Sequence, residues 1–198
     1  MFDKPYSQAC ENNKQPILDV LTKVFANGQC LLEIGSGTGQ HAAFFAPRLR
    51  QLQWHTSDMP DKHLGIKAWL NDIQAENLHQ PLALTIDAVS TGSLPISNFD
   101  AVFTANTTHI MQPAEAKRMM QLIAKHLPEN GVFCQYGPFN FDGQYTSESN
   151  KAFDQHLKMQ GCGGIRDIDE LLLWAAPLEL VETVTMPANN FLLVWKKP

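Results

Sequence analysis

Three glycines separated by single residues follow a short apolar segment near the start of the chain. The segment at positions 31–46 reads LLEIGSGTGQHAAFFA, and its glycines are Gly35, Gly37 and Gly39. Glycine lets the backbone adopt positive φ and approach a ligand closely. A helix that begins directly after such a loop points its first N–H groups at the same ligand. The spacing therefore indicates a binding loop for a nucleoside-containing cofactor, with a tight turn that binds nothing as the alternative.

The residues around the glycines narrow the choice of nucleoside. A P-loop would need lysine after its last glycine, whereas Gly39 is followed by Gln40. The dinucleotide fingerprint spaces its glycines G-x-G-x-x-G, whereas the glycines of this loop are evenly spaced and Gln40 stands where the third glycine would be. Glu33 would be poorly placed beside a diphosphate but well placed near a cationic ligand. We therefore expect Glu33 and Ser36 to join the glycines in a cofactor site that binds no pyrophosphate.

Two further acids follow the next two predicted strands. Asp58 ends a predicted strand at 52–58, and a carboxylate there can accept hydrogen bonds from both hydroxyls of a ribose. Its alternative role is the N-cap of a helix that begins near Pro60. Asp87, in the predicted strand at 81–88, could contact an adenine amino group or cap a turn. Both acids are therefore candidates for cofactor binding.

The hydrophobic pattern predicts alternating strands and helices that would position these residues. Helices are expected at 15–27, 39–50, 62–77, 113–127, 149–160 and 167–177, and strands at 30–35, 52–58, 81–88, 99–106, 130–139, 178–187 and 189–197. The link between the last two strands is too short for a crossover helix, so they must pair antiparallel. We expect one α/β domain over residues 1–198, with a doubly wound, Rossmann-like, seven-stranded, mostly parallel sheet that ends in an antiparallel hairpin and has helices on both faces.

The acids and glycines resemble the signature of the class I S-adenosylmethionine-dependent methyltransferases. In that family an acid-x-Gly-x-Gly-x-Gly pattern follows the first strand, a ribose-binding acid follows the second, and an acid or amide that contacts adenine follows the third. The matching positions in this chain are Glu33, Gly35, Gly37, Gly39, Asp58 and Asp87. The resemblance implies S-adenosyl-L-methionine as the cofactor and methyl transfer as the reaction.

Several longer segments resemble the DUF938 family, the group that includes methyltransferase-like protein 26. These segments are ACENNKQPILDVL, LEIGSGTGQHAAFFA, YGPFNFDGQYTSESNKAFDQHL, GIRDIDELLLWA and MPANNFLLVWKK. They run from the N-terminal helix to the last strand. The resemblance therefore implies the same fold and cofactor over nearly the whole chain, and it does not indicate the methyl acceptor.

Polar residues at the ends of the fourth and fifth strands are the candidates for catalysis. Methyl transfer from a sulfonium is an in-line displacement, so the protein mainly aligns the acceptor and can take a proton from it. We expect Asn106, His109 and Tyr136 in this site, with Asn106 also contacting the cofactor. His109 is the candidate general base, because its unperturbed pKa lies close to physiological pH. The alternatives are structural roles. Asn106 would form a turn, His109 would line the loop, and Tyr136 would be a packed strand residue.

Four further residues are expected to bind the substrate: Asn13, Lys14, Asn140 and Arg166. The first two belong to residues 1–28, which we interpret as an N-terminal helix that covers the cofactor as a lid. The alternative is a solvated helix start with Asn12 or Asn13 as its N-cap. Arg166 precedes a helix with Asp167 as its expected N-cap, and its guanidinium could hold a substrate carboxylate bidentately. An ion pair with an acid of the protein is the alternative for Arg166.

Composition argues against several function classes. The net charge of −5 gives no basic surface for nucleic acid or an anionic membrane. The histidines lack metal-ligand spacing, no segment is apolar enough to span a bilayer, and the N-terminus has no signal peptide pattern. The four cysteines form no C-x-x-C pair and fit reduced thiols in the cytoplasm. We expect a small polar molecule as substrate, with an NAD-dependent oxidoreductase and a cofactor-binding module without catalysis as the alternatives.

Overall fold

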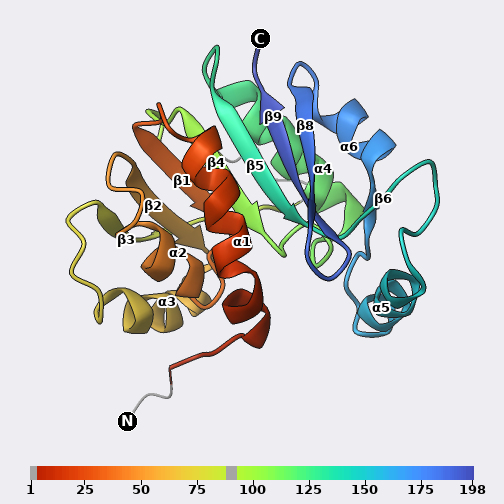
Figure 1. Cartoon of the computed structure of the whole chain (residues 1–198), viewed down its shortest axis with the longest axis horizontal. Helices are drawn as coiled ribbons and strands as arrows, with labels where there is room; N and C mark the ends of the chain where they lie inside the picture. The colour runs from red at the N-terminus through yellow and green to blue at the C-terminus, as the bar shows by residue number, and fades with distance from the viewer. Residues whose placement is uncertain (1–3, 88–92) are drawn as a thin grey trace. The chain divides into compact units, whose positions relative to one another are not determined.

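The computed structural model describes residues 4–87 and 93–198 (Figure 1). The helices are α1 (Gln8–Val24), α2 (Gln40–Phe45), η1 (Pro60–Lys62, a 3-10 turn), α3 (His63–Leu70), α4 (Pro113–His126), α5 (Glu148–Met159) and α6 (Ile168–Ala175). The strands are β1 (Cys30–Ile34), β2 (Gln53–Asp58), β3 (Leu78–Ala83), β4 (Ala101–Ala105), β5 (Val132–Gly137), β6 (Phe139–Asn140), β7 (Arg166–Asp167), β8 (Glu179–Met186) and β9 (Asn190–Lys196). In the described part of the chain, no helix combines the length and the apolar character needed to cross a bilayer.

Seven of the strands form one sheet in the order β3-β2-β1-β4-β5-β9-β8. β1 is parallel to both β2 and β4, and β2 is parallel to β3. β9 is antiparallel to both of its neighbours, β5 and β8. The predicted fold class, a mostly parallel seven-stranded sheet ending in an antiparallel hairpin, is therefore confirmed.

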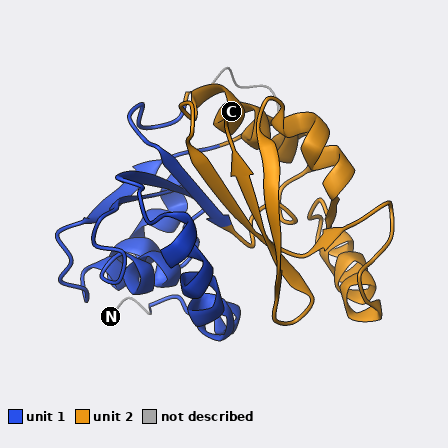
Figure 2. Cartoon of the chain, turned by 45° about the horizontal axis from the view of Figure 1, so that its top comes forward, with its two compact units in different colours: residues 1–85, 94–104 blue, residues 86–93, 105–198 orange. Residues whose placement is uncertain are grey.

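The chain divides into two compact units, which Figure 2 distinguishes by colour. Unit 1 comprises Met1–Thr85 and Leu94–Thr104, and unit 2 comprises Ile86–Ser93 and Ala105–Pro198. Unit 1 contains the glycine loop and the first helices. Unit 2 contains most of the candidate acceptor residues. The expectation of a single domain stays a prediction.

The first helix begins earlier than the sequence pattern predicts. α1 starts at Gln8 rather than near residue 15, because Ser7 is its N-cap and the Ser7 Oγ accepts a hydrogen bond from the Cys10 N–H at 3.3 Å. Asn12 and Asn13 lie inside the helix, so the expectation that one of them caps it is wrong. The first three residues of the predicted lid segment lie outside the described residues.

Several other boundaries differ from the prediction. α2 ends at Phe45, two residues before Pro47, and α3 ends at Leu70 rather than at 77. β3 runs over Leu78–Ala83 instead of 81–88, and residue 88 lies outside the described residues. Pro81 fits inside β3 because this strand is the edge of the sheet, where a missing N–H leaves no neighbour unpaired. The predicted strand at 130–139 is divided into β5 and the short β6, which pairs in parallel with the unexpected β7.

An aromatic cluster forms the centre of unit 1. The rings of Phe45, Trp54 and Phe103 are fully buried, and their centroids lie 5.7 to 5.9 Å apart in tilted and edge-on arrangements. His41 stacks on Phe45 at 5.2 Å. These four side chains come from α2, β2 and β4. They therefore fix the helix that follows the glycine loop against the strands on either side of β1.

A buried polar network organises unit 2. Phe133 and Trp195 are register partners in β5 and β9, and both are fully buried. The Trp195 indole N–H donates to the Gln135 side-chain oxygen at 3.2 Å, and the Gln135 amide donates to the Thr108 hydroxyl at 2.8 Å. These two hydrogen bonds connect the interior of the sheet to the loop after β4. They also give the buried side chains of Trp195, Gln135 and Thr108 a polar partner.

One buried amide fixes the start of β3 in unit 1. The Asn77 Nδ2 donates to the carbonyl oxygens of Ala46, Leu49 and Leu52 at 2.8, 3.2 and 2.8 Å. The Asn77 carbonyl also accepts the Trp54 N–H at 2.7 Å. Asn77 therefore ties the α2–β2 connection to the edge strand.

We expect Asn77→Ala to lower the free energy of unfolding by about 1–3 kcal/mol, because three buried carbonyls lose a donor. Gln74→Ala, an exposed change three residues before Asn77, should alter the free energy of unfolding by less than about 0.5 kcal/mol. Urea denaturation of the two variants measures the difference. Equal effects of the two substitutions would contradict the role of Asn77.

Candidate functional site

The glycine loop of unit 1 turns sharply after β1. Gly35, Gly37 and Gly39 have φ values of 72°, 57° and 87°, a region that side chains rarely adopt. The N–H groups of Gly35 and Ser36 both donate to the Ser57 carbonyl at 3.0 Å. The loop is therefore bound to the end of β2, and α2 begins directly after it.

Two of the glycines are required for different reasons. A Cβ at Gly37 would meet no atom within 4 Å, so space is open beside the backbone at that position. A Cβ at Gly39 would lie 3.0 Å from the Ile66 Cα and 3.1 Å from its carbonyl oxygen. Gly39 therefore allows close packing of the loop on α3, whereas Gly37 leaves its backbone accessible to a ligand.

Asp58 lies at the end of β2 and contacts the same loop. Its Oδ2 accepts the Gly37 N–H at 2.7 Å, and its Oδ1 accepts the Met59 N–H at 2.7 Å. Partial burial raises the pKa of Asp58 above its usual value, while the two backbone N–H groups act in the opposite direction. The N-cap of η1 is Met59, so the alternative role of Asp58 as a helix N-cap is wrong. Each carboxylate oxygen keeps one lone pair for a further donor.

Glu33 is buried behind the loop. Its Oε2 accepts the Ser36 hydroxyl at 2.9 Å and the Trp54 indole N–H at 3.0 Å. The Ser36 Oγ also accepts the Ser57 N–H at 3.1 Å. Burial raises the pKa of Glu33 to about 7, against the two hydrogen bonds, which lower it. Glu33 therefore holds the loop through Ser36.

The N-terminal residues attach to the first turn of α2. The Gln40 side chain accepts the Ser7 N–H at 2.6 Å and donates to the Ser7 carbonyl at 3.3 Å and to a Glu11 carboxylate oxygen at 3.1 Å. Asn13 is buried and its Oδ1 lies 2.7 Å from the His41 Nε2. Lys14 pairs with Glu11 and lies over the Phe44 ring. Asn13 and Lys14 thus join α1 to α2, and their predicted roles in substrate binding stay predictions.

Asn106 and Tyr136 are neighbours in unit 2. The Asn106 N–H donates to the Tyr136 carbonyl at 2.9 Å, and Asn106 has a φ of 55°. A non-glycine residue in this region is uncommon, and asparagine tolerates it better than most. Tyr136 is buried. Asp87 is exposed and also belongs to unit 2.

His109 is buried three residues after Asn106. Burial lowers the pKa of His109 to about 4, so the imidazole is neutral at physiological pH. Its ring meets the Phe153 ring edge-on at 5.5 Å, and its Nδ1 lies 3.6 Å from the position of a Cβ on Gly137. A neutral imidazole can accept a proton, although a low pKa makes it a weak base.

Asn140 and Arg166 come from the paired strands β6 and β7. Within the described residues, the Asn140 Oδ1 is a buried oxygen without a hydrogen-bond partner. Arg166 is buried, and its guanidinium donates to the carbonyls of Gly164 and Gly163. Asp167 caps α6 as predicted, accepting the Asp169 N–H at 3.0 Å.

The predicted residues thus fall into two groups. Glu33, Gly35, Ser36, Gly37, Gly39 and Asp58 lie together in unit 1. Asn106, His109, Tyr136, Asn140 and Arg166 belong to unit 2. Sequence reasoning missed Trp54, Ser57 and Gln40, which hold the loop or its helix. Gln40 directly follows the last glycine, which was the available signal for it. No group of three metal-ligating side chains occurs in residues 4–87 and 93–198.

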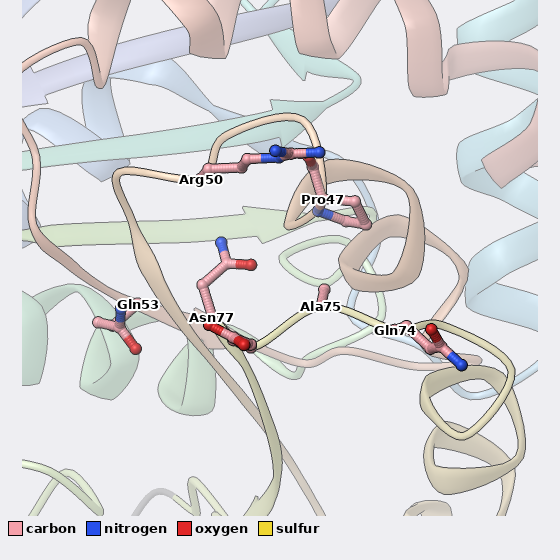
Figure 3. A pocket seen from close by; sticks show the side chains of 7 residues that line it. Pro47, Arg50, Gln53, Gln74, Ala75 and Asn77 are labelled. Carbon is pink, nitrogen blue, oxygen red and sulfur yellow. The ribbon is translucent and has the colours of Figure 1, made fainter.

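A separate pocket of about 560 Å³ lies at the other end of the parallel strands in unit 1 (Figure 3). Its lining includes Gln53, the first residue of β2, and Asn77, the residue before β3. The glycine loop instead follows the carboxyl end of β1. Because ligands of open α/β sheets bind beyond the carboxyl ends of the strands, this pocket is not the candidate site.

The buried carboxyl of Glu33 predicts a specific pH dependence. A folded pKa of about 7 exceeds the ordinary value of 4.5, so folding favours the protonated form. The stability from this group is complete below pH 4.5 and is lost as the pH rises to about 7. The difference in unfolding free energy between the wild type and Glu33→Gln should therefore fall by about 3 kcal/mol across that window. Denaturation at several pH values measures it, and a constant difference would contradict this assignment.

The two glycine positions predict unequal costs. Gly37→Ala should lower the free energy of unfolding by about 1–2 kcal/mol through backbone strain alone. Gly39→Ala adds a collision with the Ile66 backbone and should cost at least about 1 kcal/mol more. Parallel urea denaturation of both variants tests this, and equal losses would show that Gly39 is not packed against α3.

Solved structures of known methyltransferases share this fold. An O-methyltransferase family protein from Burkholderia thailandensis superimposes with a TM-score of 0.77 at 18% identity, over 93% of this chain and 56% of its own. An O-methyltransferase family 2 protein from Planctomyces limnophilus, in complex with apigenin, gives 0.80 at 16% identity, over 96% and 58%. Human N-acetylserotonin methyltransferase, in complex with SAM, gives 0.72 at 12% identity, over 93% and 54%. This chain thus spans little more than half the length of these proteins.

The structural likeness shows that this chain has the Rossmann-like methyltransferase fold. A family model covers almost the whole chain. It matches residues 4–197 and is described as "Protein of unknown function (DUF938)". The chain therefore belongs to the DUF938 family.

Proposed function

We propose that this protein is an S-adenosyl-L-methionine-dependent methyltransferase that acts on a small polar molecule. The observation that carries the proposal is the Asp58 carboxylate, which is bound to the Gly37 and Met59 N–H groups and keeps one lone pair on each oxygen. The two oxygens of one carboxylate can each accept a hydrogen bond from one of the two neighbouring hydroxyls of a ribose. The open space beside Gly37 supports the same ligand, since an adenosyl group needs close approach to the backbone.

The cofactor would supply a methyl group on a sulfonium that is ready for in-line transfer. In this proposal Asp58 holds the ribose, and the glycine loop contacts the ligand through its backbone. Glu33 keeps the loop in place through Ser36 and adds negative charge for a cationic ligand as it ionises near neutral pH. Asp87 and Asn106 are proposed to contact the adenine and the methionine moiety.

On the acceptor side, we propose that His109, Tyr136 and Asn106 orient the substrate. The burial of His109 keeps its imidazole neutral, which leaves a ring nitrogen able to accept a hydrogen bond or a proton. Asn13, Lys14, Asn140 and Arg166 are proposed to bind the substrate. Of these, the Asn140 Oδ1 is the one with an unsatisfied acceptor among the described residues.

We propose that the protein is related in function to methyltransferase-like protein 26 and that it works in the cytoplasm. The four cysteines are free thiols, which suits a reducing compartment. The structures with apigenin and with SAM support small-molecule methyl transfer for this fold.

We expect Asp58→Ala to raise the dissociation constant of S-adenosylhomocysteine at least about tenfold, the loss of ~1.4 kcal/mol of hydrogen bonding. Asp58→Asn keeps one acceptor oxygen and should have a smaller effect. Isothermal titration calorimetry measures both. Asp61→Ala is the matched control, because this exposed acid lies three residues away and pairs with Lys62.

Unchanged affinity in Asp58→Ala would remove this carboxylate from the site. The stability of the protein is also measured with S-adenosylhomocysteine and with NAD, which distinguishes a methyltransferase from an NAD-dependent oxidoreductase. At 100 times its dissociation constant a ligand stabilises the fold by about 2.7 kcal/mol. Stabilisation by S-adenosylhomocysteine and none by NAD is the expected result, and the reverse would overturn the proposed function.

A further inference from the structure

Arg166 in unit 2 is buried and makes no ion pair with an acid of the described residues. Only 6% of the residue is exposed. Of the five N–H groups of its guanidinium, one on Nε donates to the Gly164 carbonyl at 3.1 Å and one on Nη2 donates to the Gly163 carbonyl. The other three N–H groups have no partner among the hydrogen bonds of the described residues, and Nη1 keeps some access to the surface, since it is not among their fully buried atoms without a partner. The alternative expected from the sequence, a pairing of Arg166 with an acid of the protein, is not found among the ion pairs of the described residues.

The nearby acid, Asp154 of α5, already has other partners. Asp154 is buried and accepts the Tyr145 hydroxyl at 2.6 Å, the Ile165 N–H at 2.7 Å and the Lys158 ammonium at 2.7 Å. These partners lower the pKa of Asp154 against the effect of burial. Asp154 therefore balances Lys158. A buried guanidinium without a carboxylate is costly, and its neutral carbonyl partners offset only part of the cost.

The surroundings hold this guanidinium in a fixed place. The Gly164 N–H donates to the His109 carbonyl at 3.0 Å, so Arg166 and His109 are each one hydrogen bond from Gly164. A Cβ at Gly163 would lie 1.9 Å from the Met111 carbonyl oxygen, so the glycine backbone is pressed against the loop that follows His109. Arg166 is therefore anchored to the loop that carries the candidate base.

The strand pairing shows which residues accompany it. Phe139 is the register partner of Arg166, so the two side chains share one face of the β6–β7 pair. The Phe139 ring reaches within 3.9 Å of the position of a Cβ on Gly137, where the His109 Nδ1 lies at 3.6 Å. Asn140 is on the opposite face and does not belong to this group. The Arg166 face thus combines a cation and an aromatic ring, and both that ring and the His109 imidazole lie next to Gly137.

We infer that the free edge of the Arg166 guanidinium binds a carboxylate group of the methyl acceptor. The inference rests on the proposed function, because it takes the bound anion to be part of that substrate. One buried positive charge matches one negative charge, and the planar fork matches a carboxylate bidentately. Lys158, the neighbouring cation, is committed to Asp154, which disfavours a phosphate dianion.

The test uses small probes with the full chain. Sodium acetate and sodium benzoate are compared with acetamide and benzamide, which have similar shapes and no charge, and with inorganic phosphate, all at constant ionic strength. The thermal midpoint is followed by scanning fluorimetry. We expect the carboxylates to raise the midpoint in a saturable way, and the amides and phosphate to have little effect.

Three variants locate the site. Arg166→Lys should weaken carboxylate binding about tenfold, because lysine keeps the charge and lacks the fork. Arg166→Gln should abolish the response, and Arg50→Gln, the same change at an exposed arginine of unit 1, should leave it intact. If Arg166→Gln does not fold, the inference is tested by Arg166→Lys and by the comparison of the carboxylates with their amides. Equal responses to benzoate and benzamide, a full response in Arg166→Lys, loss in Arg50→Gln, or a preference for phosphate would overturn the inference.

Titration of the same proteins with S-adenosylhomocysteine separates the two proposals. Carboxylate binding at Arg166 without binding of S-adenosylhomocysteine would leave the anion site standing and remove the methyltransferase assignment. Binding of S-adenosylhomocysteine with no specific carboxylate response would do the opposite.

Discussion

The hydrogen bond from the Gly37 N–H to the Asp58 carboxylate is the constraint on which the candidate cofactor site depends. It joins the turn after β1 to the end of β2. The carboxyl ends of these two parallel strands therefore form one candidate binding surface. The same carboxylate accepts the Met59 N–H and so fixes the start of the next turn. Both bonds use backbone donors of the loop and the turn. What the site offers to a ligand is therefore a carboxylate whose orientation is set before binding.

A second layer of residues supports that contact from inside unit 1. Glu33 reaches the loop through Ser36, and Trp54 donates to the same carboxylate oxygen. Trp54 also belongs to the aromatic cluster that holds α2. Burial raises the pKa of Glu33 to about 7, so ionisation of this acid near neutral pH costs stability. Arg166 in unit 2 has the same character, since its charge is buried and two neutral carbonyls are its partners.

The sequence predicted the sheet and the glycine turn because both follow from local rules. Apolar segments that alternate with helical patterns predict the strands. Glycine at positions 35, 37 and 39 predicts the turn, because only glycine adopts positive φ readily. Boundaries were less predictable. The early start of α1 depends on the Ser7 cap. The sequence predicts a strand that starts at Pro81, whereas Pro81 lies inside β3, because the place of this strand at the sheet edge is set by tertiary structure. The contacts of Gln40, Trp54 and Asn77 join segments more than twenty residues apart, and no local pattern encodes them.

The most direct test of the central claim is an amide NMR titration of the full chain with S-adenosylhomocysteine. A ribose bound to the Asp58 carboxylate must share that carboxylate with the N–H groups of Gly37 and Met59. The account predicts that these two amide resonances shift in a saturable way, together with those of the glycine loop. Saturable binding that leaves the Gly37 and Met59 resonances in place would contradict it.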